Sequence, residues 1–258
     1  MPFTCRAPRS LLLVTALLMV PATGSAQEPG DVMHKTLDEV LKAHVSDGWV
    51  DYNGVAADRR FADYVMDLER VDAQKLATRD ERLAFWINAY NALAIQGILR
   101  GSSPKSFFGK IGFFYNDKYR VGGAVTNLYD LEHEILRPLG EPRIHFAIVC
   151  ASKSCPVLRA EAFVSDRLDS QLDDSARRFI NDPARNRFDR EKKLAHLSKI
   201  FDWFDKDFVL HSDSVSRYVA RYVNDPMLAQ ELTAGNYKIK YLDYLWDLNG
   251  APVTAPKN

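Results

Sequence analysis

A long apolar stretch in the first half of the chain constrains the fold more than any other feature. Within residues 83–99 the only clearly polar side chains are two asparagines and one glutamine. Thr78 and Glu81 have the spacing of a capping box before this stretch, and Gly101 is a typical stop after it. A helix that is apolar on nearly every face lies in the middle of a domain. We therefore expect a buried helix over 79–100, surrounded by other elements.

The two asparagines of this helix, Asn88 and Asn91, are three residues apart and share one face. Buried amides need hydrogen-bond partners. The two side chains either tie a neighbouring loop to the core or line a binding site. In both cases we expect their face to point toward the segment 144–156 and not toward solvent.

Length and charge narrow the class of protein. A chain of 258 residues suits one large domain or two small ones, and 47% hydrophobic with 26% charged residues is ordinary for a globular protein. A formal net charge of zero does not indicate binding to nucleic acid or to an anionic membrane surface. No repeat or interdomain linker interrupts the pattern, which favours a single α+β domain.

Residues 1–26 have the layout of a secretory signal peptide. Two arginines precede an apolar run over 11–20, and small residues follow up to Ala26. That run is too short to span a bilayer as a mature anchor. We expect cleavage after Ala26, a periplasmic or secreted protein, one domain over 27–250 and a loose tail over 251–258.

Periodicity and turn signals predict the order of the secondary structure. Helices are expected over 31–44, 58–69, 79–100, 127–137, 165–180 and 198–208. Extended segments are expected over 48–54 (closed by an Asn-Gly turn), 113–121 and 237–242, with a hairpin over 186–197. The clearest strand is 143–150, a short apolar run without strict alternation, which is typical of a strand buried on both faces.

Two cysteines, Cys150 and Cys155, remain after the expected cleavage. In an oxidising compartment they allow a short-loop disulfide, a metal pair or a reactive thiol. Closing so short a loop stabilises a fold little, which weakens the case for a purely structural disulfide. The spacing is also not a usual zinc signature, and we expect no metal.

These cysteines belong to a polar cluster with Glu132, His133 and His145. A thiol becomes a nucleophile when a nearby base lowers its pKa, and the base needs an orienting partner. Strand alternation would place His145 and Cys150 on opposite faces, which makes Cys155 the easier partner and the more exposed thiol. The simpler alternative is a satisfied core histidine and inert buried cysteines.

Several long motifs of the chain, in order, resemble the domain-of-unknown-function family 547. They are GWVDY at 48–52, FWINAYNA at 85–92, LEHEILR at 131–137, IHFAIVCASKSCP at 144–156, LSKIF at 197–201 and YLWDLN at 244–249. The resemblance implies a fold related to papain-like cysteine peptidases, with a central buried helix packed on a small, mostly antiparallel sheet among other helices. It also places His145 at the position of the papain-like histidine. A papain-like nucleophile begins the central helix, and no cysteine stands there in this chain.

Together these features predict an exported thiol-dependent hydrolase or acyl transferase for a peptide or amide-like substrate. The expected roles are nucleophile for Cys150 or Cys155, base for His145 or His133, orienting carboxylate for Glu132, and polar support of the site for Asn88 and Asn91. The alternative is a non-catalytic module that binds a peptide or a small thiol such as glutathione in the same cleft. No cofactor, nucleic-acid partner or membrane span of the mature chain is expected.

Overall fold

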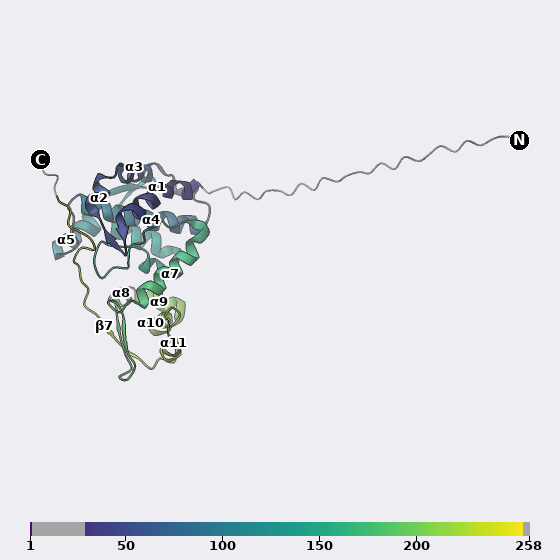
Figure 1. The fold of residues 1–258 in the computed structure, drawn as a ribbon, viewed down its shortest axis with the longest axis vertical. Helices are drawn as coiled ribbons and strands as arrows, with labels where there is room; N and C mark the ends of the chain where they lie inside the picture. The colour runs from purple at the N-terminus through teal and green to yellow at the C-terminus, as the bar shows by residue number, and fades with distance from the viewer. Residues whose placement is uncertain (2–28, 255–258) are drawn as a thin grey trace.

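The computed structural model describes Met1 and residues 29–254, which form an α+β structure (Figure 1). Apart from Met1, the expected signal peptide over 1–26 lies outside the described residues, as does the end of the expected tail, 255–258. The described strands pair into two two-stranded sheets and one three-stranded sheet. Among the described residues no helix combines the length and the apolar character that a bilayer crossing requires.

Helix α4 (Arg79–Leu99) is the centre of the larger core, as expected. The capping box is formed: the Thr78 hydroxyl accepts the Glu81 N–H at 3.1 Å, and the Glu81 carboxylate accepts the Thr78 N–H at 2.7 Å. The helix packs chiefly on the helical elements α1 (Pro29–His44) and η3 (Leu131–Leu136), and strand β3 (Tyr119–Val121) also meets it, with the Tyr119 hydroxyl beside Gly97.

The amides of α4 hold backbone segments that have no strand partner. Asn91 accepts the Val149 N–H at 2.8 Å and donates to the Ala147 carbonyl at 3.0 Å, as expected for a face directed at 144–156. Asn88 instead makes both of its hydrogen bonds to the backbone of Phe163. The expectation that both amides face 144–156 is therefore correct for Asn91 and wrong for Asn88. The alternative, that the amides tie neighbouring chain to the core, fits both residues.

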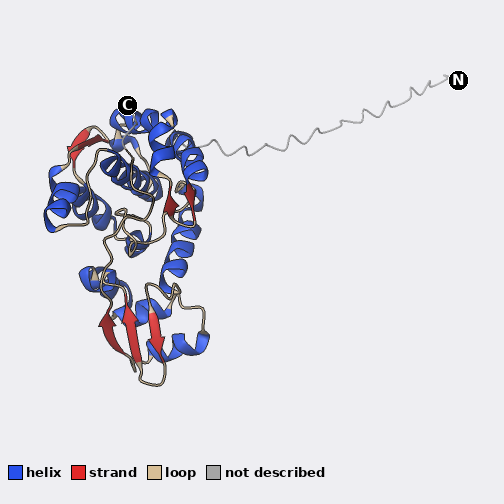
Figure 2. Cartoon of the chain, turned by 60° about the vertical axis from the view of Figure 1, so that its left-hand side comes forward, coloured by secondary structure: helices blue, strands red, loops and turns tan. Residues whose placement is uncertain are grey.

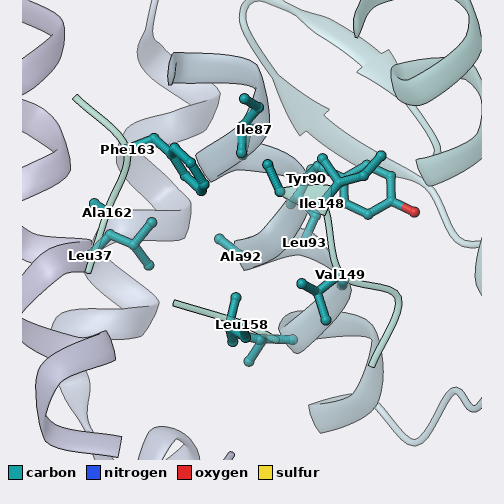
Figure 3. Close-up of a cluster of buried hydrophobic side chains, with 14 of the residues drawn as sticks. Leu37, Ile87, Tyr90, Ala92, Leu93, Ile148, Val149, Leu158, Ala162 and Phe163 are labelled. Atoms are coloured by element: carbon teal, nitrogen blue, oxygen red, sulfur yellow. The ribbon is translucent and has the colours of Figure 1, made fainter. Parts of the chain in front are cut away.

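Figure 3 shows buried hydrophobic side chains that pack around α4. Ile148 and Val149 pass one side of the helix, while Ala162 and Phe163 pass another. The phenol of Tyr90 points away from the cluster. The two amides therefore fix two separate stretches of chain on the same helix.

The expected strand over 143–150 is wrong. Residues Pro142–Phe146 form the 3₁₀ helix η5, started by the Glu141 carboxylate, which accepts the Arg143 N–H at 3.2 Å. After η5 the chain turns at Ala147 and has no regular secondary structure over 148–150, where Asn91 binds the backbone of Ala147 and Val149. Apolar character predicted burial correctly here, and the proline with its preceding cap decided the conformation.

Two other extended segments are also corrected. The Asn-Gly pair at 53–54 lies inside helix α2 (Tyr52–Ala57), because the Asp51 carboxylate caps the helix by accepting the Gly54 N–H at 2.9 Å. Residues Gly112–Asn116 form a π-helical turn, so strand β3 begins only at Tyr119.

A second, smaller core lies at the other end of the molecule (Figure 2). The expected hairpin forms from β5 (Arg187–Asp189) and β6 (Leu194–Leu197), and β7 (Lys238–Tyr241) pairs with β6 in parallel. Phe146 enters this core from η5 and stacks on Phe179 at 5.0 Å. Because Ile144 of η5 lies in the larger core, this short helix contributes side chains to both cores.

The remaining elements surround these cores. They are β1 (Val45–Ser46), β2 (Trp49–Val50), α3 (Arg59–Arg70), η1 (Ala73–Lys75), α5 (Phe107–Ile111), η2 (Gly112–Asn116), β3 (Tyr119–Val121), β4 (Ala124–Thr126), α6 (Leu128–Asp130), η4 (Arg137–Leu139), η6 (Ser165–Arg167), α7 (Leu168–Ile180), α8 (Ile200–Trp203), α9 (Asp205–Ser212), α10 (Val215–Ala220) and α11 (Pro226–Thr233). In Figure 1, α7 leads from the group of α1 to α4 toward α8 to α11 and β7.

A buried histidine makes the larger core sensitive to acid. His34 on α1 is 1% exposed, lies 2.8 Å from the Tyr64 hydroxyl, and has its pKa lowered by burial to about 3. The folded protein keeps it neutral, whereas the unfolded chain protonates it below about pH 6.5. Its contribution is therefore complete above pH 6.5 and is lost as the pH falls toward 3.

We expect this one group to lower the free energy of unfolding by about 2 kcal/mol between pH 7.5 and pH 5. Urea unfolding at the two pH values measures the difference, and His34→Gln should reduce it by that amount. The control is His196→Gln, at a partly buried histidine of β6, which should leave the difference as in the wild type. An unchanged difference in His34→Gln would contradict the assignment.

Candidate functional site

A cavity of about 370 Å³ lies between the two cores and contains the polar cluster predicted from the sequence. Its wall includes all five candidates for catalysis: Glu132, His133, His145, Cys150 and Cys155. They come from η3, from η5 and from the loop that follows η5. Asn88 and Asn91 are absent from this wall, and their amides hold backbone instead.

His145 is held between two carboxylates. Its Nε2 atom lies 2.8 Å from Oδ2 of Asp207 on α9, and its Nδ1 atom lies 3.7 Å from Oε1 of Glu132. The imidazole also stacks on Phe204, with the ring centroids 4.0 Å apart. The side chain that hydrogen-bonds this base is therefore Asp207, in the role that the sequence suggested for Glu132.

The contacts of His145 define its tautomer. A carboxylate accepts hydrogen bonds, so Nε2 carries the proton that Asp207 receives. In the neutral ring the lone pair is then on Nδ1, which has no hydrogen-bond partner among the described residues. This unprotonated Nδ1 atom is buried and lies on the side of the ring that faces Glu132, 3.7 Å from Oε1.

Asp207 is kept ionised by its partners. Burial raises the pKa of this carboxyl, but hydrogen bonds from His145 and Arg137 outweigh it and hold the pKa well below its usual range. Arg137 binds both carboxylate oxygens, with Nε 2.7 Å from Oδ2 and Nη2 2.9 Å from Oδ1. This bidentate pair fixes the carboxylate that orients the imidazole.

His133 is the second imidazole on the wall, and its surroundings differ. It stacks on Tyr129 at 3.9 Å, and its Nδ1 atom lies 3.1 Å from the Tyr129 carbonyl oxygen. Because a carbonyl only accepts, Nδ1 donates and the lone pair of the neutral ring is on Nε2. His133 thus lacks the carboxylate partner at hydrogen-bond distance that His145 has in Asp207.

Cys150 and Cys155 are joined by a disulfide in the cavity wall. Cys155 is 3% exposed and Cys150 9% exposed, so the expectation that Cys155 is the more accessible thiol is wrong. The prediction of opposite faces for His145 and Cys150 also fails, since it assumed a regular strand. The turn between the cysteines is closed by the Cys155 N–H, which donates to the Ser152 carbonyl at 3.1 Å.

Aromatic side chains form most of the remaining wall. Tyr244 contacts Trp203 and Trp246, with ring centroids 4.8 Å and 4.5 Å away, and the two tryptophans stack on each other at 5.9 Å. The Lys110 ammonium lies 4.0 Å above the Trp246 ring. The wall also includes Tyr90, Phe114, Tyr115, Tyr129 and Phe204. A ligand here meets mainly apolar faces, with the charged and sulfur-containing groups at a few positions.

Three residues of the site, Asp207, Tyr244 and Lys110, are not predicted by the sequence patterns. Asp207 lies among aromatic core positions of a predicted helix. No sequence motif links it to His145, which is 62 residues away in the chain. Tyr244 is the first residue of the motif at 244–249 that carries part of the family resemblance. That motif is the one sequence feature that could have pointed to Tyr244 as a site residue. Among the described residues no group of three or more His, Cys, Asp or Glu side chains is arranged to hold a metal ion.

The central part of this site lies in a recognisable family segment. Residues 74–180 match the family model DUF547, described as a protein of unknown function. The DUF547 match includes α4, both histidines of the cavity and both cysteines, and supports the resemblance for that segment. Asp207 and Tyr244 lie beyond it. No curated protein and no solved structure matches the chain.

Proposed function

We propose that this protein is a thiol-dependent hydrolase or acyl transferase for a peptide or amide-like substrate, active when its Cys150–Cys155 disulfide is reduced. The observation that carries the proposal is the set of side chains that line one cavity. Two sulfurs and an imidazole held by a carboxylate line the same wall. Nucleophile, base and orienting group are the three parts that this chemistry needs.

The residues divide the reaction between them. Nδ1 of His145 takes the proton of a cysteine thiol, and the thiolate attacks the substrate carbonyl to form a thioester. The imidazolium returns the proton to the departing amine. Water or another acceptor then attacks the thioester and frees the thiol. Asp207 and Glu132 stabilise the positive charge that the ring carries between these steps.

A papain-like relationship is part of this proposal. The tautomer of His145 and its carboxylate partner fit a cysteine–histidine site with an orienting third residue. The difference is the source of the thiol, which comes from the loop after η5 and not from the start of α4. The aromatic wall favours a substrate with an apolar or aromatic group beside the amide.

Turnover in the two redox states tests the proposal. The reduced and the oxidised protein are each given a panel of fluorogenic peptide amides and thioesters. We expect turnover only after reduction. One of the two variants Cys150→Ser and Cys155→Ser should lose this turnover, and the other should retain it. Equal rates in the oxidised protein and in both variants would sink the proposal.

A non-catalytic binding module is the second candidate, favoured by the disulfide that joins both sulfurs of the cavity. Such a module would bind a peptide or a small thiol on the aromatic wall. Titration of the oxidised protein with peptides, followed by the fluorescence of Trp203 and Trp246, measures this. Saturable quenching together with no product in either redox state would favour the module over the enzyme.

Export to the periplasm or secretion belongs to the proposal because of the pattern of residues 1–26. The intact mass of the protein recovered from the periplasm or the medium tests it. A mass that begins at Gln27 would support export, and a mass that retains Met1 would contradict it.

A further inference from the structure

We propose that a low-molecular-weight thiol opens the Cys150–Cys155 disulfide by attacking Sγ of Cys150, and that Cys155 leaves as the thiolate. The inference deepens the proposed function, on which it rests for the reactive role of the two sulfurs. It names the class of molecule that activates the site. It also assigns the two sulfurs different roles.

The hydrogen bonds to the two sulfurs are unequal. Sγ of Cys155 accepts the Cys150 backbone N–H at 3.0 Å and the Tyr244 hydroxyl at 3.1 Å. Sγ of Cys150 has longer contacts of 3.4 Å, to the hydroxyls of Ser152 and Tyr244. The shorter hydrogen bonds, including the one from a backbone N–H, are therefore those to Cys155.

The hydroxyl protons support the same assignment. Ser152 donates its one hydroxyl proton to the Tyr244 oxygen at 3.0 Å, which leaves the Tyr244 proton for Cys155. Burial raises the pKa of Tyr244, so this hydroxyl keeps its proton and stays a donor. Hydrogen bonds to an ionised group are stronger than those to a neutral one, and both donors gain strength as Cys155 becomes a thiolate.

Access favours attack at the other sulfur. Cys150 is the more exposed of the two residues, and both line a cavity of about 370 Å³. The scale of this cavity suits a small thiol, whereas a thiol fixed on the surface of another protein has to reach a side chain that is at most 9% exposed. A low-molecular-weight thiol is therefore the reactant that the geometry admits.

The exchange step balances. The incoming thiol loses its proton to solvent, and its thiolate forms a new S–S bond with Cys150. The Cys150–Cys155 bond breaks, and its electron pair leaves on Cys155. The incoming thiol is oxidised to a mixed disulfide while Cys155 is reduced. Hydrogen bonds that stabilise the leaving thiolate accelerate this step.

Reduced glutathione is the probe. The oxidised protein is mixed with it, quenched with acid at early times and labelled with N-ethylmaleimide, and the peptides are read by mass spectrometry. We expect glutathione on Cys150 and maleimide on Cys155. The reverse pattern, an equal division or no mixed disulfide would overturn the inference.

Tyr244→Phe tests the donor without removing the ring, and Tyr115→Phe is the matched control at another tyrosine of the cavity wall. We expect opening by glutathione to be about tenfold slower in Tyr244→Phe and unchanged in Tyr115→Phe. Equal rates in the two variants would count against the role of the Tyr244 hydroxyl.

The proposed function and this inference fail separately. A mixed disulfide on Cys150 in a protein that turns over no peptide substrate would support the inference and contradict the proposed function. Turnover after reduction by a phosphine, with no mixed disulfide from glutathione, would overturn the inference alone.

Discussion

His145→Gln is expected to lower the turnover of the reduced protein by about 100- to 10,000-fold, the usual contribution of a general base. The reason is that Nδ1 of His145 accepts the thiol proton in the proposed reaction, and glutamine has no basic nitrogen. Initial rates at saturating and at low substrate measure the effect. The loss should be in kcat, because the base acts on the chemical step and not on substrate binding.

His133→Gln is the matched control, because His133 lines the same cavity without a carboxylate at hydrogen-bond distance. We expect its rate to stay within about tenfold of the wild type. Thermal unfolding of both variants shows whether the fold is retained. A large loss in His133→Gln with little loss in His145→Gln would reverse the assignment of the base.

Asp207→Asn is expected to lower kcat by about 100- to 10,000-fold as well, as in triads whose orienting carboxylate is replaced. An asparagine can present its NH₂ group to Nε2, which favours the wrong tautomer of His145. It also leaves Arg137 without its bidentate partner, so a loss of about 1–3 kcal/mol in stability should accompany the kinetic effect. Asp205→Asn, an exposed position on the same helix, is the control.

A double variant of Asp207 and His145 shows whether Asp207 acts by positioning His145 or has its own effect on the reaction. If Asp207 acts only through His145, adding Asp207→Asn to His145→Gln should lower kcat little further. Losses that multiply would show that Asp207 acts on the reaction by another route. In that case Asp207 does not act by orienting His145, although its ion pair with Arg137 remains.

Local signals predicted much of the fold. The capping box at Thr78 and the apolar run behind it gave α4 its start and its burial, because both depend on residues close in sequence. The charged turn between β5 and β6 likewise predicted the hairpin. The apolar pattern over 143–150 predicted a strand, and this prediction was wrong. A capping residue and a proline, Glu141 and Pro142, start the helix η5 there instead.

The sequence predicted five of the residues that line the cavity, but not the hydrogen bonds that hold them. The motif resemblance and the residue types brought Glu132, the two histidines and the two cysteines together, and the cavity contains all five. The partner of His145 comes from a helix that is 62 residues further along the chain. Such a contact is set by the packing of η5 against α9, which periodicity does not encode.

The pH dependence of cysteine alkylation tests the central claim most directly. The reduced protein is treated with iodoacetamide across the pH range, and the rate at each cysteine is read by peptide mass spectrometry in the wild type and in His145→Gln. An activated thiol should show an apparent pKa below the usual value of about 8.5 in the wild type, returning toward it in His145→Gln. Two cysteines that titrate at or above about 8.5 in both proteins would contradict the account.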